Sequence, residues 1–161
     1  MTEVRTPVEQ LNELVRGIQF AMFTTIHVDG FPHSCPMATQ EADAGGHLWF
    51  FTRTDTSKVL ALRDNKNVCV AYAEAATDRY VSVTGIGELV RNEAKARELW
   101  NPLYKTWFPQ GLDDPKLVLI RVLITEAEFW DAAERKMVRV AGFSKKALAD
   151  EVYPATSNQD L

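Results

Sequence analysis

The chain has 161 residues, with 18 Lys and Arg against 22 Asp and Glu, and its formal net charge is -4 at pH 7. This length suits one domain, and a composition of 46% hydrophobic and 25% charged residues argues against a disordered or fibrous protein. The slight acidity argues against a general binder of nucleic acid or anionic membranes. No apolar run approaches the ~20 residues of a membrane helix, and the N-terminus lacks the apolar segment of a secretory signal. We therefore expect one cytoplasmic domain over residues 1–161.

Cysteine and histidine spacings give no metal motif. Cys35 and Cys69 lie far apart in the sequence, and in a reducing cytoplasm we expect two free thiols. His33 and Cys35 share a face of a predicted strand, and His27 and His47 could lie near them. The spacing matches no zinc arrangement, so we expect polar strand residues and no metal.

Four helices are predicted from caps and spacing. Thr6, Pro7 and Glu9 form a capping box with a proline at the first helical position, which predicts a helix beginning at Pro7. The other three predicted helices cover residues 58–64, residues 92–100 with Asn92 as the cap, and residues 137–152.

Six strands are predicted from β-branched and aromatic runs and from alternating polarity. They cover residues 20–27, 31–41, 47–52, 68–73, 79–90 and 117–130. Asp29-Gly30 indicates a hairpin, and the first three strands are expected to form an antiparallel meander. Gly85 and Gly87 indicate a bulge or bend. The fold class is therefore mainly β with short helices, a small six-stranded antiparallel barrel.

The junction at residues 51–58 is a candidate phosphate site. A strand ends there and a helix begins, and helix N-termini present free N–H groups to anions. Ser57 adds a hydroxyl, while Arg53 and Lys58 add positive charge. The alternative is simple helix capping, which Asp55 alone would provide.

Four tryptophans are many for a chain of this size, and Trp100 and Trp107 belong to an aromatic stripe with Leu99, Leu103 and Tyr104. Such aromatic side chains fill a core, form a dimer interface or wall a flat heterocyclic ligand. The stripe alone does not choose among these.

Several segments together resemble one family in their order and spacing. They are FAMFTT at 20–25, PMATQ at 36–40, LWFFT at 48–52 followed by Ser57-Lys58, and RYVSVTG at 79–85; LW at 99–100, WFP at 107–109 and EFWD at 128–131 extend the match. The sequence resembles the FMN-binding split-barrel family related to pyridoxamine 5'-phosphate oxidase, in the general stress protein branch. The resemblance covers about residues 8–150.

The resemblance implies a six-stranded split barrel that forms a homodimer with two FMN sites at the subunit interface. By position, Ser57 and Lys58 would hold the FMN phosphate, with Thr52 nearby. The remaining cofactor-binding positions that it implies are Thr24, Thr25 and Phe51, the segment Pro36, Met37, Ala38 and Thr39 along the isoalloxazine edge, and Trp107 as a wall from the other subunit.

Two departures from the family pattern matter. Relatives commonly carry an arginine immediately before the Pro-Met pair, and here Cys35 stands there as either an inert or a redox-active thiol. Losing a guanidinium would weaken binding of an anionic cofactor unless Arg53 or Arg79 replaced it. True pyridoxamine phosphate oxidases have an arginine-rich C-terminal segment, whereas residues 147–154 are acidic and lack arginine. This argues against oxidation of vitamin B6.

The leading functional prediction is an FMN-dependent oxidoreductase of unknown substrate, in which the flavin carries the electrons. No motif identifies a general acid or base, so no catalytic residue is assigned. One alternative is a non-catalytic FMN-binding or redox-sensing stress protein. The other is a split barrel that binds a different flat cofactor, deazaflavin or haem.

Overall fold

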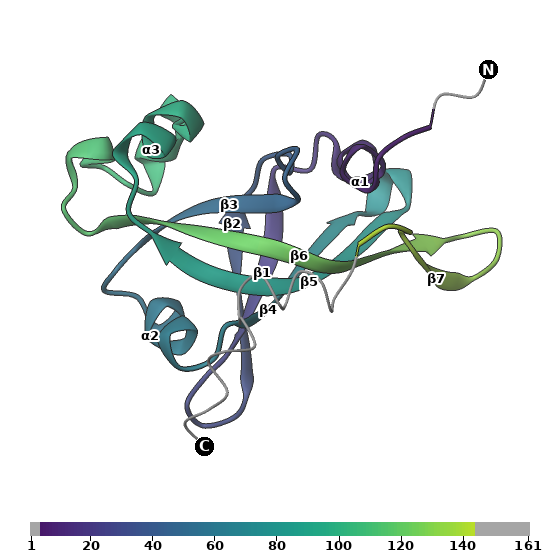
Figure 1. The fold of residues 1–161 in the computed structure, drawn as a ribbon, viewed down its shortest axis with the longest axis horizontal. Coiled ribbons are helices and arrows are strands. Elements are labelled where there is room, and N and C mark those ends of the chain that lie inside the picture. Colours follow the sequence, from purple (N-terminus) through teal and green to yellow (C-terminus); the bar gives the residue numbers. More distant parts are fainter. Residues whose placement is uncertain (1–3, 144–161) are drawn as a thin grey trace.

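The computed structural model describes residues 4–143 (Figure 1). The strands are β1 (Phe20–Ile26), β2 (Pro32–Ala38), β3 (His47–Arg53), β4 (Asn67–Glu74), β5 (Arg79–Val90), β6 (Leu117–Asp131) and β7 (Lys136–Arg139). The α-helices are α1 (Pro7–Val15), α2 (Ser57–Asp64) and α3 (Glu93–Leu99), and the short 3-10 helices are η1 (Ala75–Thr77), η2 (Pro102–Thr106) and η3 (Gly111–Asp113). None of the helices in this range is long and apolar enough to span a membrane.

The strands form one strongly curled antiparallel sheet in the order β2-β1-β4-β5-β6-β3, with β7 paired to β6 (Figure 1). This arrangement confirms the predicted split barrel. Strands β2 and β3 are the two edges of the sheet path and are not paired to each other. The barrel is therefore open along a seam between β2 and β3.

The predicted three-strand meander is wrong. Strand β1 pairs with β2 through the predicted Asp29-Gly30 hairpin, but β3 pairs with β6 along its whole length, from His47 opposite Leu123 to Arg53 opposite Leu117. The β2–β3 connection over residues 39–46 is long enough for the chain to leave β2 and join the opposite edge. Local turn patterns do not determine whether β3 pairs with β2 or with the distant strand β6.

The predicted C-terminal helix is wrong over its described part. Residues 136–139 form β7, and Met137 lies opposite Trp130 of β6. Asp131 turns the chain because its side chain accepts hydrogen bonds from the N–H groups of Ala133 and Glu134, and Arg135 takes a left-handed conformation with φ 52°. Residues 144–152 of that prediction lie outside the described residues.

The caps of α1 and α3 agree with the prediction. Thr6 accepts a hydrogen bond from the N–H of Glu9, whose side chain accepts one from Thr6 in return. Asn92 caps α3 by accepting from the N–H of Lys95. These short polar side chains satisfy amide groups that a helix start leaves unpaired.

Two hydrophobic clusters lie on opposite faces of β3. The main core fills the barrel and includes Phe23, Phe50 and Tyr72. Burial raises the pKa of the Tyr72 hydroxyl to about 12. The second cluster, around Phe51 and Tyr104, packs residues 92–108 against the outer face of β3 and β6. Figure 1 shows α3 and this segment at one end of the sheet and α1 toward the other.

Candidate functional site

A pocket of about 320 Å³ opens at the seam between the edge strands; we call it the seam pocket. Residues of β1, β2, β3, α2 and the segment after α3 contribute to it. Its lining residues are Phe20, Pro36, Met37, Ala38, Phe51, Thr52, Arg53, Thr56, Lys58, Tyr104, Trp107 and Phe108. The pocket has a polar end at the start of α2 and an aromatic end beside β1.

The polar end combines a cation with unpaired amide groups. The ammonium of Lys58 donates a hydrogen bond to Oγ1 of Thr52 at 3.3 Å, and no carboxylate in residues 4–143 pairs with it. Thr56 is the N-cap of α2, but its hydroxyl donates back to the carbonyl of Arg53. The N–H groups of Ser57 and Lys58 consequently have no partner within the described range. This geometry suits an anion.

Asp55 does not cap α2, which corrects the capping alternative. Its carboxylate instead accepts hydrogen bonds from Arg53 at 3.2 Å and pairs with Lys116 at 3.5 Å. Arg53 also pairs with the buried Asp114. The hydrogen bonds between Arg53 and Asp55 raise the pKa of the guanidinium and lower that of the carboxyl. Arg53 therefore lines the pocket with most of its charge balanced.

The aromatic end is formed by side chains from β1 and the segment after α3. Phe20 and Trp107 make an edge-to-face contact with ring centroids 5.3 Å apart, and Tyr104 lies 6.4 Å from Trp107. Trp107 keeps 48% of its surface exposed and Phe20 keeps 44%. Exposed aromatic faces at a pocket suit a flat ring system.

The structure brings together seven of the eleven predicted cofactor-binding residues in the seam pocket, namely Pro36, Met37, Ala38, Phe51, Thr52, Lys58 and Trp107. Ser57 adjoins Lys58 and is exposed. Thr24, Thr25 and Thr39 do not line the pocket: their hydroxyls bond to Ser34, to His27 and to Tyr72, respectively.

Trp107 lines the seam pocket of its own chain. A Trp107 side chain contributed by the other subunit, as the resemblance implies, stays a prediction. Arg79 does not replace the missing arginine, because its guanidinium donates to the carbonyls of Leu14 and Arg16 beside α1. Cys35 is a free, partly buried thiol next to the pocket residue Pro36.

Sequence reasoning missed several residues of the pocket lining, among them Phe20, Tyr104 and Phe108. Strand alternation places Phe20 on the outward face of β1, and this signal was present in the sequence. The other two come from a 3-10 turn and the loop after it, whose position over β3 depends on tertiary packing.

The histidines lie outside the pocket. The rings of His27 and His33 stack with centroids 3.8 Å apart near the β1–β2 hairpin, while His47 bonds to Asp43 at 3.2 Å. Within residues 4–143, no three His, Cys, Asp or Glu side chains are arranged to hold a metal ion.

Comparison with known proteins identifies the class. The family model for pyridoxamine 5'-phosphate oxidase-like proteins matches residues 6–154, so the chain belongs to this family. Protein bli-3 of Neurospora crassa is 25% identical over 162 residues, covering 94% of this chain and 77% of that protein.

Solved structures of general stress proteins are similar to this chain. A Clostridium acetobutylicum protein related to general stress protein 26 of Bacillus subtilis has a TM-score of 0.72 at 21% identity, covering 88% of this chain and 96% of that one. A general stress FMN/FAD binding protein from Xanthomonas citri has a TM-score of 0.65 at 29% identity, covering 83% and 92%. The first likeness concerns the fold, and the second is with a protein whose name states flavin binding.

Proposed function

We propose that this protein binds FMN in the seam pocket and acts as a flavin-dependent oxidoreductase. The proposal rests on the different chemistry of the two ends of the pocket. Lys58 and free amide groups lie at one end, and the exposed rings of Phe20 and Trp107 lie at the other. A phosphate and a flat ring joined by a linker match these two ends. Membership of the family and the Xanthomonas citri relative support the same choice.

The chemistry of the lining fits FMN. The Lys58 ammonium and the Ser57 and Lys58 amides are donors for phosphate oxygens. Edge strands leave N–H and C=O groups unpaired, and the free edge of β2 at Pro36–Ala38 offers them to the polar rim of an isoalloxazine. Trp107 offers an apolar surface to the ring. These groups act in the absence of an arginine at position 35.

When bound, FMN would supply hydride or single-electron transfer, while this chain would bind and orient it and shield the ring from water. No acid or base of the pocket is assigned to catalysis. A non-catalytic or redox-sensing protein would differ from an oxidoreductase in one observable, the absence of turnover. A protein that binds deazaflavin or haem would differ from an FMN-binding protein in its visible spectrum.

We also propose that the protein is a homodimer whose subunits meet on the outer face of β2, β1 and β4. Residues paired directly across antiparallel strands share a face, so Met22 lies on the same surface as Pro36 and Ala71. This face is uncharged over most of its length, and its residues include Phe20, Met22, Thr24, Ser34, Pro36, Ala38, Cys69, Ala71 and Ala73. A solvated sheet face normally carries charges, and depletion of charge is typical of interfaces. Because Phe20 and Pro36 also line the seam pocket, a second subunit here would cover its mouth.

Met22→Glu is expected to convert the dimer to a monomer. Met22 is 44% exposed at the centre of the uncharged face and does not line the seam pocket, so a carboxylate there would be buried without a partner in the dimer. Light scattering should give about 36 kDa for the wild type, twice the 18.2 kDa of one chain, and half of that for the variant. A wild type that elutes as a monomer would contradict the proposed dimer.

The first test of the function is the visible spectrum of the purified protein before and after FMN is added and free flavin is removed. A retained flavin spectrum that bleaches with a nicotinamide donor is expected. Retained flavin without reduction by any donor tried would favour the non-catalytic alternative. A colourless protein would contradict FMN binding.

A further inference from the structure

Gln40 joins the two sides of the seam pocket. It follows β2 closely, just after the lining residues Pro36–Ala38. Its side-chain Nε2 donates hydrogen bonds to the carbonyl of Leu99 at 2.7 Å and to the hydroxyl of Tyr104 at 2.9 Å. A side-chain amide has two N–H donors, so these bonds use both of them. Because Leu99 ends α3 and Tyr104 lies in η2, Gln40 connects the β2 side of the seam to the segment that covers β3.

Both acceptors of these hydrogen bonds depend on Gln40. Leu99 is the last residue of α3, where helix carbonyls lack an intrahelical partner. Tyr104 is only 7% exposed, and within residues 4–143 the Gln40 amide is the one hydrogen-bond partner of its hydroxyl. Removing the amide would therefore leave two polar groups of this segment without a protein partner, which costs free energy in a partly buried place.

The position of Tyr104 determines the position of the residues that follow it. The backbone carbonyl of Tyr104 accepts hydrogen bonds from the N–H of Trp107 at 3.0 Å and from the N–H of Phe108 at 2.9 Å. The rings of Tyr104 and Trp107 also lie 6.4 Å apart between centroids. All three residues line the seam pocket. A contact that fixes Tyr104 consequently fixes this whole wall of the pocket.

No other hydrogen bond performs this task. In the part of the chain that the structure describes, the two bonds from Gln40 are the only hydrogen bonds from residues 99–108 to residues 4–91. The segment otherwise packs on the sheet through aromatic and apolar side chains around Phe51. Apolar burial is not directional, whereas a hydrogen bond requires a defined distance and angle. Gln40 therefore supplies the orientation that packing alone leaves open.

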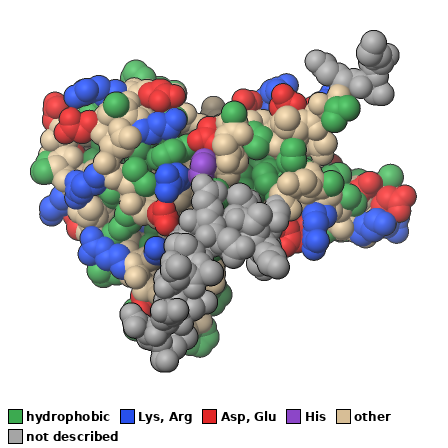
Figure 2. Space-filling model, viewed as in Figure 1, with side chains coloured by type: hydrophobic (Ala, Val, Ile, Leu, Met, Phe, Trp, Pro, Cys, Tyr) green, Lys and Arg blue, Asp and Glu red, His purple; other side chains and the backbone are tan. Residues whose placement is uncertain are grey.

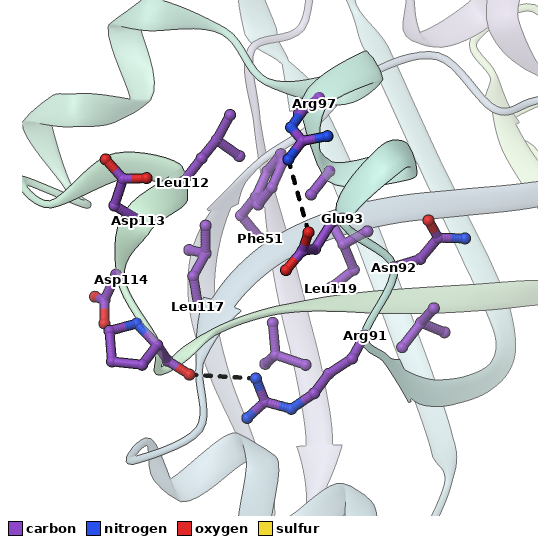
Figure 3. Close-up of a pocket in the computed structure, with 14 residues that line it drawn as sticks. Phe51, Arg91, Asn92, Glu93, Arg97, Leu112, Asp113, Asp114, Leu117 and Leu119 are labelled. Carbon is purple, nitrogen blue, oxygen red and sulfur yellow. Dashed lines mark hydrogen bonds and ion pairs between the residues drawn. The ribbon is translucent and has the colours of Figure 1, made fainter.

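The surroundings of α3 give the segment little further support. A cavity of about 640 Å³ separates α3 from residues 112–115 (Figure 3). Arg97 and Glu93 pair with each other on the helix itself at 3.6 Å and do not tie it to the sheet (Figure 3). Figure 2 shows acidic and basic side chains interspersed over this end of the molecule. Such exposed charges contribute little to holding a segment in place.

We propose that Gln40 is a positioning residue, which holds Tyr104 and Trp107 as a preorganised wall of the seam pocket and thereby sets the affinity for the ring of the bound flavin. This rests on the proposed function in one respect, that a flavin ring occupies the aromatic end. A wall that is already in place when the ring arrives spares the ligand the cost of ordering it. The phosphate end does not involve Gln40.

Gln40→Met tests the proposal because methionine has nearly the same length and no N–H to donate. It should weaken binding of FMN and of riboflavin by the same factor, about fivefold, since both ligands carry the ring. Fluorescence quenching of each flavin gives the dissociation constants. Gln10→Met is the matched control: Gln10 is exposed in α1 toward the other end of the sheet, and its replacement should change either constant less than twofold (Figure 1).

Tyr104→Phe removes the acceptor and keeps the ring, so the core packing of Tyr104 is preserved. It should weaken both flavins about threefold. In the Tyr104→Phe background, Gln40→Met should cost less than it does in the wild type, because one of its two bonds is already absent. Losses that multiply independently in the double variant would contradict an action of Gln40 through Tyr104.

A second readout uses the protein without flavin. The four tryptophans are replaced by fluorotryptophan, and the fluorine resonance of Trp107 is identified by its absence in Trp107→Phe. Gln40→Met should shift or broaden the Trp107 resonance and leave that of Trp130, on β6, unchanged. Gln10→Met should change neither. A residue that merely stabilised the fold would lower the melting temperature without moving the Trp107 resonance.

An unchanged Trp107 resonance in Gln40→Met would overturn the proposal, as would a loss of affinity for FMN that riboflavin does not share. The two proposals fail separately. A wild type that binds neither flavin would contradict the proposed function, while the fluorine spectrum would still show whether Gln40 positions Trp107. Flavin binding that is unaffected by Gln40→Met would overturn the role of Gln40 and leave the flavin site intact.

Discussion

Lys58→Gln is expected to weaken FMN binding by about 10- to 100-fold, because a charge-assisted hydrogen bond contributes about 1.5–3 kcal/mol and about 1.4 kcal/mol corresponds to a factor of ten. The Lys58 ammonium has only the Thr52 hydroxyl as a partner within the described range, so its charge is available to a phosphate. The dissociation constant follows from quenching of flavin fluorescence as protein is added. Glutamine preserves most of the side-chain length and removes the charge.

Arg63→Gln is the matched control for this result. Arg63 lies in the last turn of the same helix, is exposed and does not line the seam pocket, so its removal changes the net charge equally. Arg63→Gln should change the dissociation constant for FMN by less than twofold. Equal losses in the two variants would indicate general electrostatic attraction and contradict a phosphate site at Lys58. Riboflavin, which lacks the phosphate, should bind the wild type and Lys58→Gln alike.

The polar end of the pocket could be predicted from the sequence because its signal is local. A strand end, a helix start and Ser57-Lys58 lie within eight residues, and the structure places Lys58 and Thr52 at hydrogen-bond distance. The alternative in which Asp55 caps the helix is wrong, because residues distant in the sequence hold its carboxylate elsewhere. Lys116 and Asp114, about sixty residues away, complete an ion-pair network with Arg53 and Asp55 and draw that carboxylate away from the helix.

The wrong meander shows why the pocket itself could not be predicted from residue patterns. If β3 paired with β2, the edge groups at Pro36–Ala38 would be used in the sheet and no seam would exist. Because β3 pairs with β6, the barrel stays open between β2 and β3, and the pocket forms there. Only the family resemblance, which implied a split barrel, carried that information.

The aromatic end of the pocket also combines a feature that the sequence indicates with one that depends on tertiary packing. Tryptophan content predicted a wall for a flat ligand, a core or an interface, and the structure assigns different roles to different rings. Trp100 packs edge-to-face on Phe51 in the second cluster, whereas Trp107 remains half exposed against Phe20 at the pocket. Spacing along the stripe does not separate the two, because their environments are set by how residues 92–108 fold over β3.

Gly85→Ala is expected to lower the free energy of unfolding by about 3 kcal/mol, at the upper end of the usual cost of overpacking. Strand β5 shifts register against β6 between Thr84 and Gly85, so the predicted bulge is confirmed. A Cβ at position 85 would lie 2.4 Å from the carbonyl oxygen of Leu123. This neighbour is backbone in the longest strand and cannot rotate away.

Gly87→Ala provides the comparison that isolates this cause. A Cβ at position 87 would meet side-chain methyl groups of Leu62 and Val68 at 3.0 and 3.1 Å, which can move by a few tenths of an ångström. For Gly87→Ala we expect the free energy of unfolding to fall by about 1 kcal/mol. For Gly85→Ala, the loss of about 3 kcal/mol corresponds to a drop in melting temperature of roughly 6–12 °C. Thermal and urea unfolding of the FMN-free proteins measure both. If the two variants lost equal stability, the contact with the Leu123 carbonyl would not be the reason for glycine at position 85, and the close approach of β5 to β6 at the bulge would have to relax at little cost.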